Sequence, residues 1–173
     1  MSTRILLLEK ISNLLDESID IDKVKSISLK LDDRVSFEYD GYEYGMMIQK
    51  IENENRSIFP KIFTLPEDLE GYYNFGFDVN GLTAREETKS YKEIAKPLSI
   101  IIKSLLDWMQ NNNPYLITVF ADSKTTEEKV KKIGLYGTIL HREKNRLENL
   151  GYYWDFFNSP SYGKSIYLKK LNK

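Results

Sequence analysis

Residues 134–154 read GLYGTILHREKNRLENLGYYW, and this stretch joins a helix to a strand. Leucines recur at helical spacing before Gly151: Leu140, Leu147 and Leu150. Glycine commonly follows a helix because it accepts the left-handed backbone conformation found there. The next residues, YYWDFF at 152–157, have the aromatic content typical of a strand. The stretch therefore predicts a helix over about 126–150 that leads into a strand starting at residue 152.

The same alternation of helix and strand extends toward the N-terminus. Residues 115–121, YLITVFA, form a short continuous apolar run, as expected of a strand that is covered on both faces. An apolar stripe from Ile94 to Met109 predicts a helix before that strand. Ser90 and Glu93 match the capping pattern at the start of this helix.

The N-terminal half alternates with a period of two. This pattern predicts strands over 27–31, 35–39, 42–48 and 73–79. Asp40-Gly41 is a two-residue hairpin signal, because glycine accepts the positive φ that such turns need. Residues 3–16 carry an apolar stripe at helical spacing and predict a first helix.

Residues 52–71 contain two prolines and predict an irregular excursion, with one short strand near Ile62 and Phe63. KSIYLKK at 164–170 predicts a closing edge strand. The expected fold is of the α/β class, with helices flanking a mixed, mostly antiparallel (α+β) sheet. The predicted order is α-β-β-β-β-α-β-α-β-β, in a single domain over residues 1–173.

The composition excludes several function classes. Lys plus Arg number 25 and Asp plus Glu number 26, so a general nucleic-acid binder is not expected. The chain has no cysteine, which fits a reducing cytoplasm. No apolar run approaches the roughly 20 residues of a membrane span, and the N-terminus does not resemble a signal peptide. We therefore expect a cytoplasmic protein without a membrane partner.

Few side chains suggest chemistry by their spacing. His141 is the single histidine and lies in a run with Arg142 and Lys144, which favours an exposed basic stretch over a general base. Acidic pairs occur at Asp32-Asp33 and Glu127-Glu128, but they lack the spacing of a hard-cation site. Turn and cap chemistry explains them more simply, so no metal site is expected.

Aromatic residues are unusually dense, with 12 tyrosines, 8 phenylalanines and 2 tryptophans. Strand alternation places Tyr153 and Phe157 on the face opposite to Tyr152 and Trp154. Such rings can form a protein interface, stack on bases or line a small-ligand pocket, or fill a sheet core. The interface candidates are Tyr153, Phe157, Tyr42 and Tyr44.

The order of elements resembles the GNAT (Gcn5-related N-acetyltransferase) fold over nearly the whole chain. In that family the helix after the fourth strand starts at a loop of the form R/Q-x-x-G-x-G/A, whose backbone N–H groups hold the coenzyme A pyrophosphate. Here residues 81–99 read GLTAREETKSYKEIAKPLS, and no glycine occurs from Leu82 to Ile133. The family also often carries a Tyr four residues before a Gly-aromatic pair, as general acid. Leu147 stands at that position here.

The resemblance thus implies the fold without its usual coenzyme loop. It implies a non-catalytic domain without a cofactor that acts through contacts with a protein partner or through self-association. The alternative is an N-acyltransferase that uses acetyl-CoA and acts on an amine. In that case Arg85, Lys89 and Lys96 would hold the coenzyme and Asp78 would be the base. Asp78 also falls on the face where strand alternation predicts a solvent-facing residue.

The richness in Lys, Asn, Ile and Tyr also resembles small tailed-bacteriophage proteins. Some members of that group are virion components. This second resemblance implies a phage structural or accessory role, in the host cytoplasm or in the virion.

Overall fold

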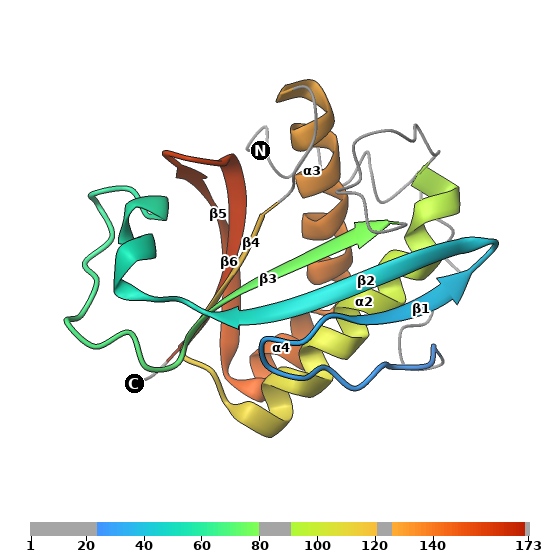
Figure 1. The fold of residues 1–173 in the computed structure, drawn as a ribbon, viewed down its shortest axis with the longest axis horizontal. Helices are drawn as coiled ribbons and strands as arrows, with labels where there is room; N and C mark the ends of the chain where they lie inside the picture. Colours follow the sequence, from blue (N-terminus) through green and yellow to red (C-terminus); the bar gives the residue numbers. More distant parts are fainter. Residues whose placement is uncertain (1–23, 80–90, 121–125, 172–173) are drawn as a thin grey trace.

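One six-stranded sheet organises the chain. The computed structural model describes residues 24–79, 91–120 and 126–171. The strands lie in the order β1-β2-β3-β4-β6-β5 (Figure 1). The β3–β4 pair is parallel and all other neighbours are antiparallel. The strands are β1 (Val35–Tyr39), β2 (Tyr42–Lys50), β3 (Tyr72–Val79), β4 (Leu116–Val119), β5 (Tyr152–Ser159) and β6 (Gly163–Lys170). This mixed sheet with flanking helices confirms the predicted fold class.

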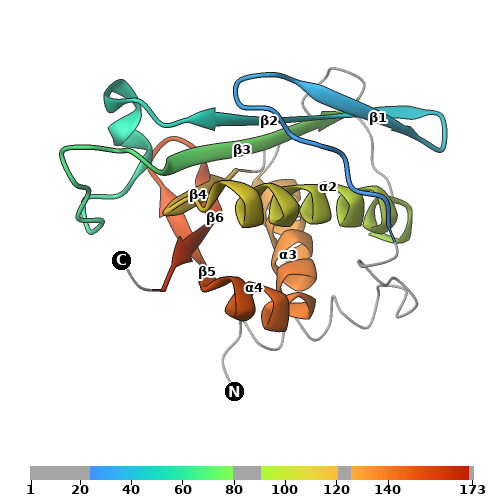
Figure 2. The same cartoon turned by 90° about the horizontal axis from the view of Figure 1, so that it is seen from below.

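The three described α-helices lie on one side of the sheet (Figure 2). They are α2 (Tyr91–Asn112), α3 (Thr126–Arg142) and α4 (Lys144–Leu150). The apolar stripe of α2, including Leu105 and Leu106, is buried against Met46 of β2 and Phe75 of β3. The same core includes Ile133 of α3. Residues of β4 are buried on both faces, as the apolar run at 115–121 predicts.

The hairpin between β1 and β2 forms as its sequence predicts. Tyr39 and Tyr42 are register partners, so the loop has the two residues Asp40 and Gly41. Both have positive φ, +50° and +79°. A two-residue turn with two positive φ angles matches the right-handed twist of the paired strands.

Residues 27–31 do not form the predicted strand. Within the described chain their sheet pairing is a single parallel bridge from Leu31 to Ile48. Instead, the Ile27 N–H donates to Ser104 Oγ of α2 at 2.9 Å, and Lys103 Nζ donates to the Val24 carbonyl. Of the three alternating apolar residues, Leu29 is buried and Ile27 packs against the core, while Leu31 is 45% exposed. Side chains of α2 hold this backbone in place of a neighbouring strand.

The predicted helix over 126–150 is divided at Glu143 into α3 and α4. The Glu143 N–H still donates to the Ile139 carbonyl, and the Leu147 N–H donates to the Glu143 carbonyl. The break is therefore a local bend between two short helices. Gly151 ends α4 with φ +85° and ψ 28°, which confirms the predicted glycine cap.

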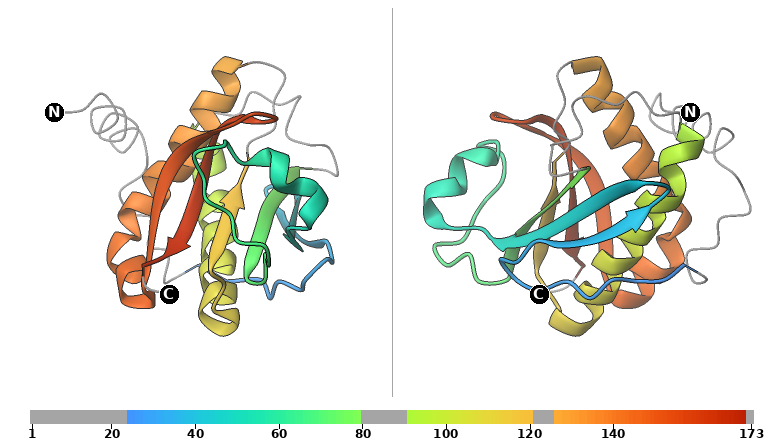
Figure 3. Two further views of the ribbon diagram at one scale, coloured as in Figure 1. Left: turned by 90° about the vertical axis from the view of Figure 1, so that its left-hand side faces the viewer. Right: turned by 45° about the vertical axis from the view of Figure 1, so that its right-hand side comes forward.

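The excursion at residues 52–71 lies on the side of the sheet opposite the helices (Figure 3, left). It contains the 3-10 helix η2 (Asn53–Ile58), and the predicted short strand near Ile62 and Phe63 is absent. Arg56 stabilises it by donating to Asn53 Oδ1 and to the carbonyls of Pro66 and Glu67. A second apolar cluster lies beneath the excursion: Ile51, Phe59, Leu69, Tyr72 and Leu116.

The predicted helix at residues 3–16 and the Ser90 cap lie outside the described residues.

Candidate functional site

The parallel strands β3 and β4 part from each other in the middle of the sheet (Figure 1). Their pairing runs from Tyr72–Leu116 to Phe75–Val119. Strand β3 then continues to Val79, paired with Tyr44 of β2 on its other side. Within the described residues, no strand lies beside β3 after Phe75 on the β4 side. The carboxyl ends of parallel strands at a change of strand order are a common place for ligands.

The backbone direction of β3 shows which groups lie at this parting. The Tyr72 carbonyl accepts the Ile51 N–H at 2.9 Å, so this carbonyl points toward β2, while the Tyr72 N–H donates to the Leu69 carbonyl. The main-chain N–H and C=O groups of successive strand residues point alternately to the two neighbouring strands. Those of Asp78 therefore also point toward β2, and those of Phe77 point toward the β4 side. The Tyr73 carbonyl lies 3.5 Å from Thr118 Oγ1 of β4, as this alternation requires. Phe77 thus presents one N–H and one C=O at the parting.

The Phe77 side chain closes the helix side of the parting. Its ring meets the ring of Tyr136 of α3 edge-on, with 5.4 Å between centroids. Tyr136 is 2% exposed, and burial raises the pKa of its hydroxyl far above the ordinary value. The hydroxyl is therefore neutral at any physiological pH. The sequence offers one signal for this placement, since Ile133, Tyr136 and Leu140 share a helical stripe.

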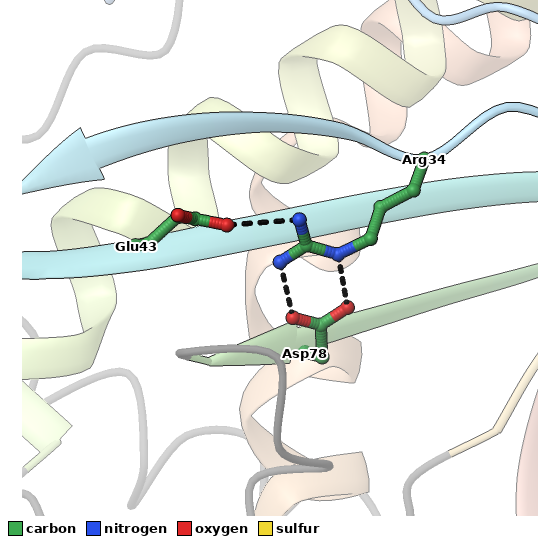
Figure 4. Close-up of polar contacts among 3 residues, drawn as sticks. All are labelled: Arg34, Glu43 and Asp78. Atoms are coloured by element: carbon green, nitrogen blue, oxygen red, sulfur yellow. Dashed lines mark hydrogen bonds and ion pairs between the residues drawn. The ribbon is translucent and has the colours of Figure 1, made fainter.

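A charged cluster of Arg34, Glu43 and Asp78 lies on the opposite face of the sheet (Figure 4). Arg34 Nε donates to Asp78 Oδ2 at 3.0 Å and Nη2 donates to Asp78 Oδ1 at 2.7 Å. Arg34 Nη1 donates to Glu43 Oε1 at 2.8 Å. These hydrogen bonds to Asp78 and Glu43 raise the pKa of Arg34 above its already high value. We call these three residues the Arg34 cluster.

The Arg34 cluster depends on a glycine beneath it. Gly45 is the register partner of Asp78 and has no side chain on this face. Arg34 therefore reaches from the chain before β1 across β2 to β3. A β-carbon on Gly45 would lie 2.4 Å from Arg34 Nε and from Nη2. Gly76 differs, because a β-carbon there would meet nothing within 4 Å.

Asp78, the predicted candidate base, lies on the face without helices, as strand alternation predicts. Its two carboxylate oxygens each accept a hydrogen bond from Arg34, and its side chain is 22% exposed. Such a pairing stabilises the ionised carboxylate and orients both oxygens toward the guanidinium. Arg34 could not be identified from the sequence, because 44 residues separate it from Asp78.

The structure describes one of the three candidate coenzyme-binding residues. Lys96 lies on α2 and is exposed. Arg85 and Lys89 lie outside the described residues.

The four aromatic interface candidates have different surroundings. Tyr44 and Phe157 are 1% and 8% exposed, so neither offers a surface to a partner. Tyr42 is half-buried against the main core, and Tyr153 is 37% exposed. The alternation at 152–157 is confirmed, because Tyr152 faces the helix-side core while Phe157 contacts the excursion.

Many of the aromatic residues pack together where residues 52–71 meet β5 and β6, which accounts for part of their high number. Phe63 contacts the rings of Phe157 and Tyr167 at 5.6 and 5.4 Å, and Phe120 stacks on Tyr162 at 4.4 Å. Ser159 Oγ also donates to the Ile58 carbonyl. We call this the excursion cluster; its members are Phe59, Phe63, Phe120, Tyr153, Phe157, Tyr162 and Tyr167. It attaches residues 52–71 to the face of β5 and β6.

His141 is exposed in the last turn of α3, as its basic neighbours predict. Among the described residues, no three His, Asp or Glu side chains are grouped so as to hold a metal ion. In the same part of the chain, no helix combines the length and apolar composition that crossing a bilayer requires.

The chain matches no protein-family model, no curated protein and no solved structure.

Proposed function

We propose that this chain is a GNAT-like domain without catalytic activity that acts through contacts with another protein. The order of described elements supports the proposal: three strands, a helix, a strand, a helical segment and two strands. The parting of β3 and β4 supplies a place where such a domain can receive another molecule.

The state of Asp78 carries the non-catalytic part of this proposal. A general base must direct a free lone pair at the proton it removes. Both Asp78 oxygens instead accept hydrogen bonds from Arg34, at 3.0 and 2.7 Å. Taking a proton from a substrate would compete with this bidentate pairing.

The sequence before α2 supports the same conclusion. A pyrophosphate cradle needs backbone that approaches the phosphates closely, which glycine allows. No glycine occurs from Leu82 to Ile133, and Pro97 lies within the first turns of α2. Lys96 is exposed beside Pro97 and offers a charge without such a cradle.

The alternative is an acyl-CoA-dependent N-acyltransferase of unusual type. One observation favours it: where β3 and β4 diverge, the main-chain groups of Phe77 point into the gap. A carbonyl of an acyl-pantetheine arm in this gap could accept a hydrogen bond from the Phe77 N–H. In that reading Lys96, with Arg85 and Lys89, holds the phosphates.

A further extension of the proposal is a structural or accessory role in a tailed bacteriophage. It rests on composition alone.

Titration of the purified chain with acetyl-CoA separates the two functions. Binding is measured by calorimetry and by the shift in melting temperature. A specific ligand at one hundred times its Kd adds about 2.7 kcal/mol of stability. We expect neither heat nor a shift at millimolar ligand. Saturable micromolar binding that Lys96→Ala weakens, while Lys144→Ala on α4 leaves it unchanged, would contradict our proposal and call for a screen of amine substrates.

A further inference from the structure

We propose that the free edge of β3 beyond β4 binds an extended, basic segment of a partner protein by strand addition. This inference rests on the proposed function and specifies the kind of partner. It assigns the contact to residues 76–79, where β3 is paired with β2 on one side only within the described residues.

The main chain of Phe77 provides the first reason. Strand addition requires main-chain donors and acceptors that point out of the sheet. The Tyr72–Ile51 hydrogen bond fixes the alternation of β3, so the Phe77 N–H and C=O point away from β2. An extended chain that lies beside β3 beyond the end of β4 at Val119 can form hydrogen bonds with both the N–H and the C=O of Phe77.

The surroundings of this edge accept the side chains of an added strand. Side chains of a strand alternate between the two faces of a sheet. On the face without helices, Gly76 leaves open space, since a β-carbon there meets no atom within 4 Å. On the helix side, the half-buried ring of Phe77 offers an apolar surface, and the buried ring of Tyr136 packs against it. The added segment therefore needs an apolar residue on one face and tolerates a long one on the other.

The charge next to this edge favours a basic segment. The Arg34 cluster has two carboxylates for one guanidinium. Glu38 of β1 lies directly opposite Glu43 of β2 in the register, and like charges at such positions repel each other. These four residues have a net charge of −2, from three acids and one base. Neighbouring strands lie about 4.8 Å apart, so an added strand is next to Asp78 on β3 and about 10 Å from Glu43 on β2, while Glu38 on β1 is about 14 Å away. Asp78 and Glu43 are therefore the acids within the roughly 10 Å over which charges act at 0.1 M salt. Lysine or arginine in the added strand would offset this charge.

The test uses a matched pair of variants at residue 77. Phe77→Pro removes the N–H that points away from β2, so the β2–β3 hydrogen bonds remain intact. Phe77→Ala loses the same ring but keeps the N–H. Random peptides of about ten residues are displayed on phage and selected on the immobilised full chain, and the enriched peptides are then synthesised and titrated.

We expect the enriched peptides to combine Lys or Arg with β-branched residues. They should bind Phe77→Pro at least roughly tenfold more weakly than Phe77→Ala, because only the proline variant lacks the donor. Asp78→Asn with Glu43→Gln should also weaken them. Equal binding to both Phe77 variants would overturn strand addition while leaving a protein-binding function intact. No enrichment together with acetyl-CoA binding would overturn both proposals.

A second measurement covers the case in which Phe77→Pro does not fold. Amide hydrogen exchange is followed in the wild-type chain with and without the best peptide. Strand addition predicts that the peptide slows exchange of the Phe77 amide. A bound peptide that leaves this amide unchanged would contradict the proposal.

Discussion

The Arg34 guanidinium lies against the backbone of Gly45, at a distance that leaves no room for a β-carbon between them. This contact lets Arg34 cross β2 and join the chain before β1 to Asp78 near the end of β3. The ion pair therefore fixes the strand segment that borders the proposed binding edge. It also engages both carboxylate oxygens of Asp78, the candidate base.

Gly45→Ala should break this arrangement without unfolding the protein. Its β-carbon would lie 2.4 Å from Arg34 Nε, and the guanidinium is the flexible end of its side chain. We expect the free energy of unfolding to fall by about 1 kcal/mol or less, because the pair is partly exposed. Urea denaturation measures this change. Gly76→Ala is the control: its β-carbon meets nothing, so stability should be unchanged or slightly increased.

A double-mutant cycle should detect the Arg34–Asp78 pair directly. The variants are Arg34→Met, Asp78→Asn and the combination of the two. We expect a coupling free energy of roughly 0.5–1 kcal/mol at low salt, given the exposure of 33% for Arg34 and 22% for Asp78. This coupling should shrink in 1 M salt, where the Debye length is about 3 Å. A coupling of zero at low salt would show that the pair does not form in solution.

Phe157→Ala should destabilise the protein strongly and release the excursion. Phe157 is 8% exposed and contacts the rings of Phe59, Phe63 and Phe120. A buried Phe→Ala change costs about 3–5 kcal/mol. Ile62→Ala serves as the comparison, because Ile62 is 88% exposed and its truncation should stay within about 0.5 kcal/mol. Proteolysis at Lys61 should quicken in the Phe157 variant alone.

Stability should fall in alkali through a buried tyrosine. Burial raises the pKa of Tyr152 to about 12 from its ordinary 10.0, and its hydroxyl donates to the Pro114 carbonyl at 2.5 Å. The folded state keeps this proton more tightly than the unfolded state does. Its contribution is therefore complete below pH 10 and is lost as the pH rises toward 12.

Urea denaturation across this pH range checks the tyrosine prediction. Tyr152→Phe should be less stable than the wild type at neutral pH by about 1 kcal/mol, because the Pro114 carbonyl loses its donor. The variant should also lose less stability between pH 10 and 12. Parallel stability curves for the two proteins would rule out a role for Tyr152 in this pH dependence.

Local pattern predicted much of the fold, because burial and turn chemistry act over a few residues. The Asp40-Gly41 turn, the glycine cap at 151 and the buried strand at 115–121 follow from such signals. Residues 27–31 show the limit of this reasoning. Their alternation matches burial only at Ile27 and Leu29, whose backbone is held by α2 instead of by a neighbouring strand, while Leu31 is exposed.

The candidate site was less accessible from the sequence, because its parts are distant along the chain. The alternation of apolar and polar residues along β3 placed Asp78 on the correct face of the sheet. It does not reveal that Arg34 binds Asp78 on that face. The register of β2 against β3 decides that Gly45 lies beside Asp78, and only then can Arg34 reach across. The parting of β3 and β4 likewise follows from the end of their register at Phe75 and Val119. No single segment encodes either relationship.

Residue-resolved amide hydrogen exchange of the free protein shows whether β3 is paired at Phe77. Among the described residues, no strand lies beside Phe77 on the β4 side. The amides of Phe75 and Asp78 should be protected from exchange, because the Phe75 N–H points toward β4 and the Asp78 N–H points toward β2. We predict that the Phe77 amide exchanges at least roughly tenfold faster than either of them. A Phe77 amide as slow as its neighbours would mean that the edge is already paired, and the account of partner binding at β3 would be wrong.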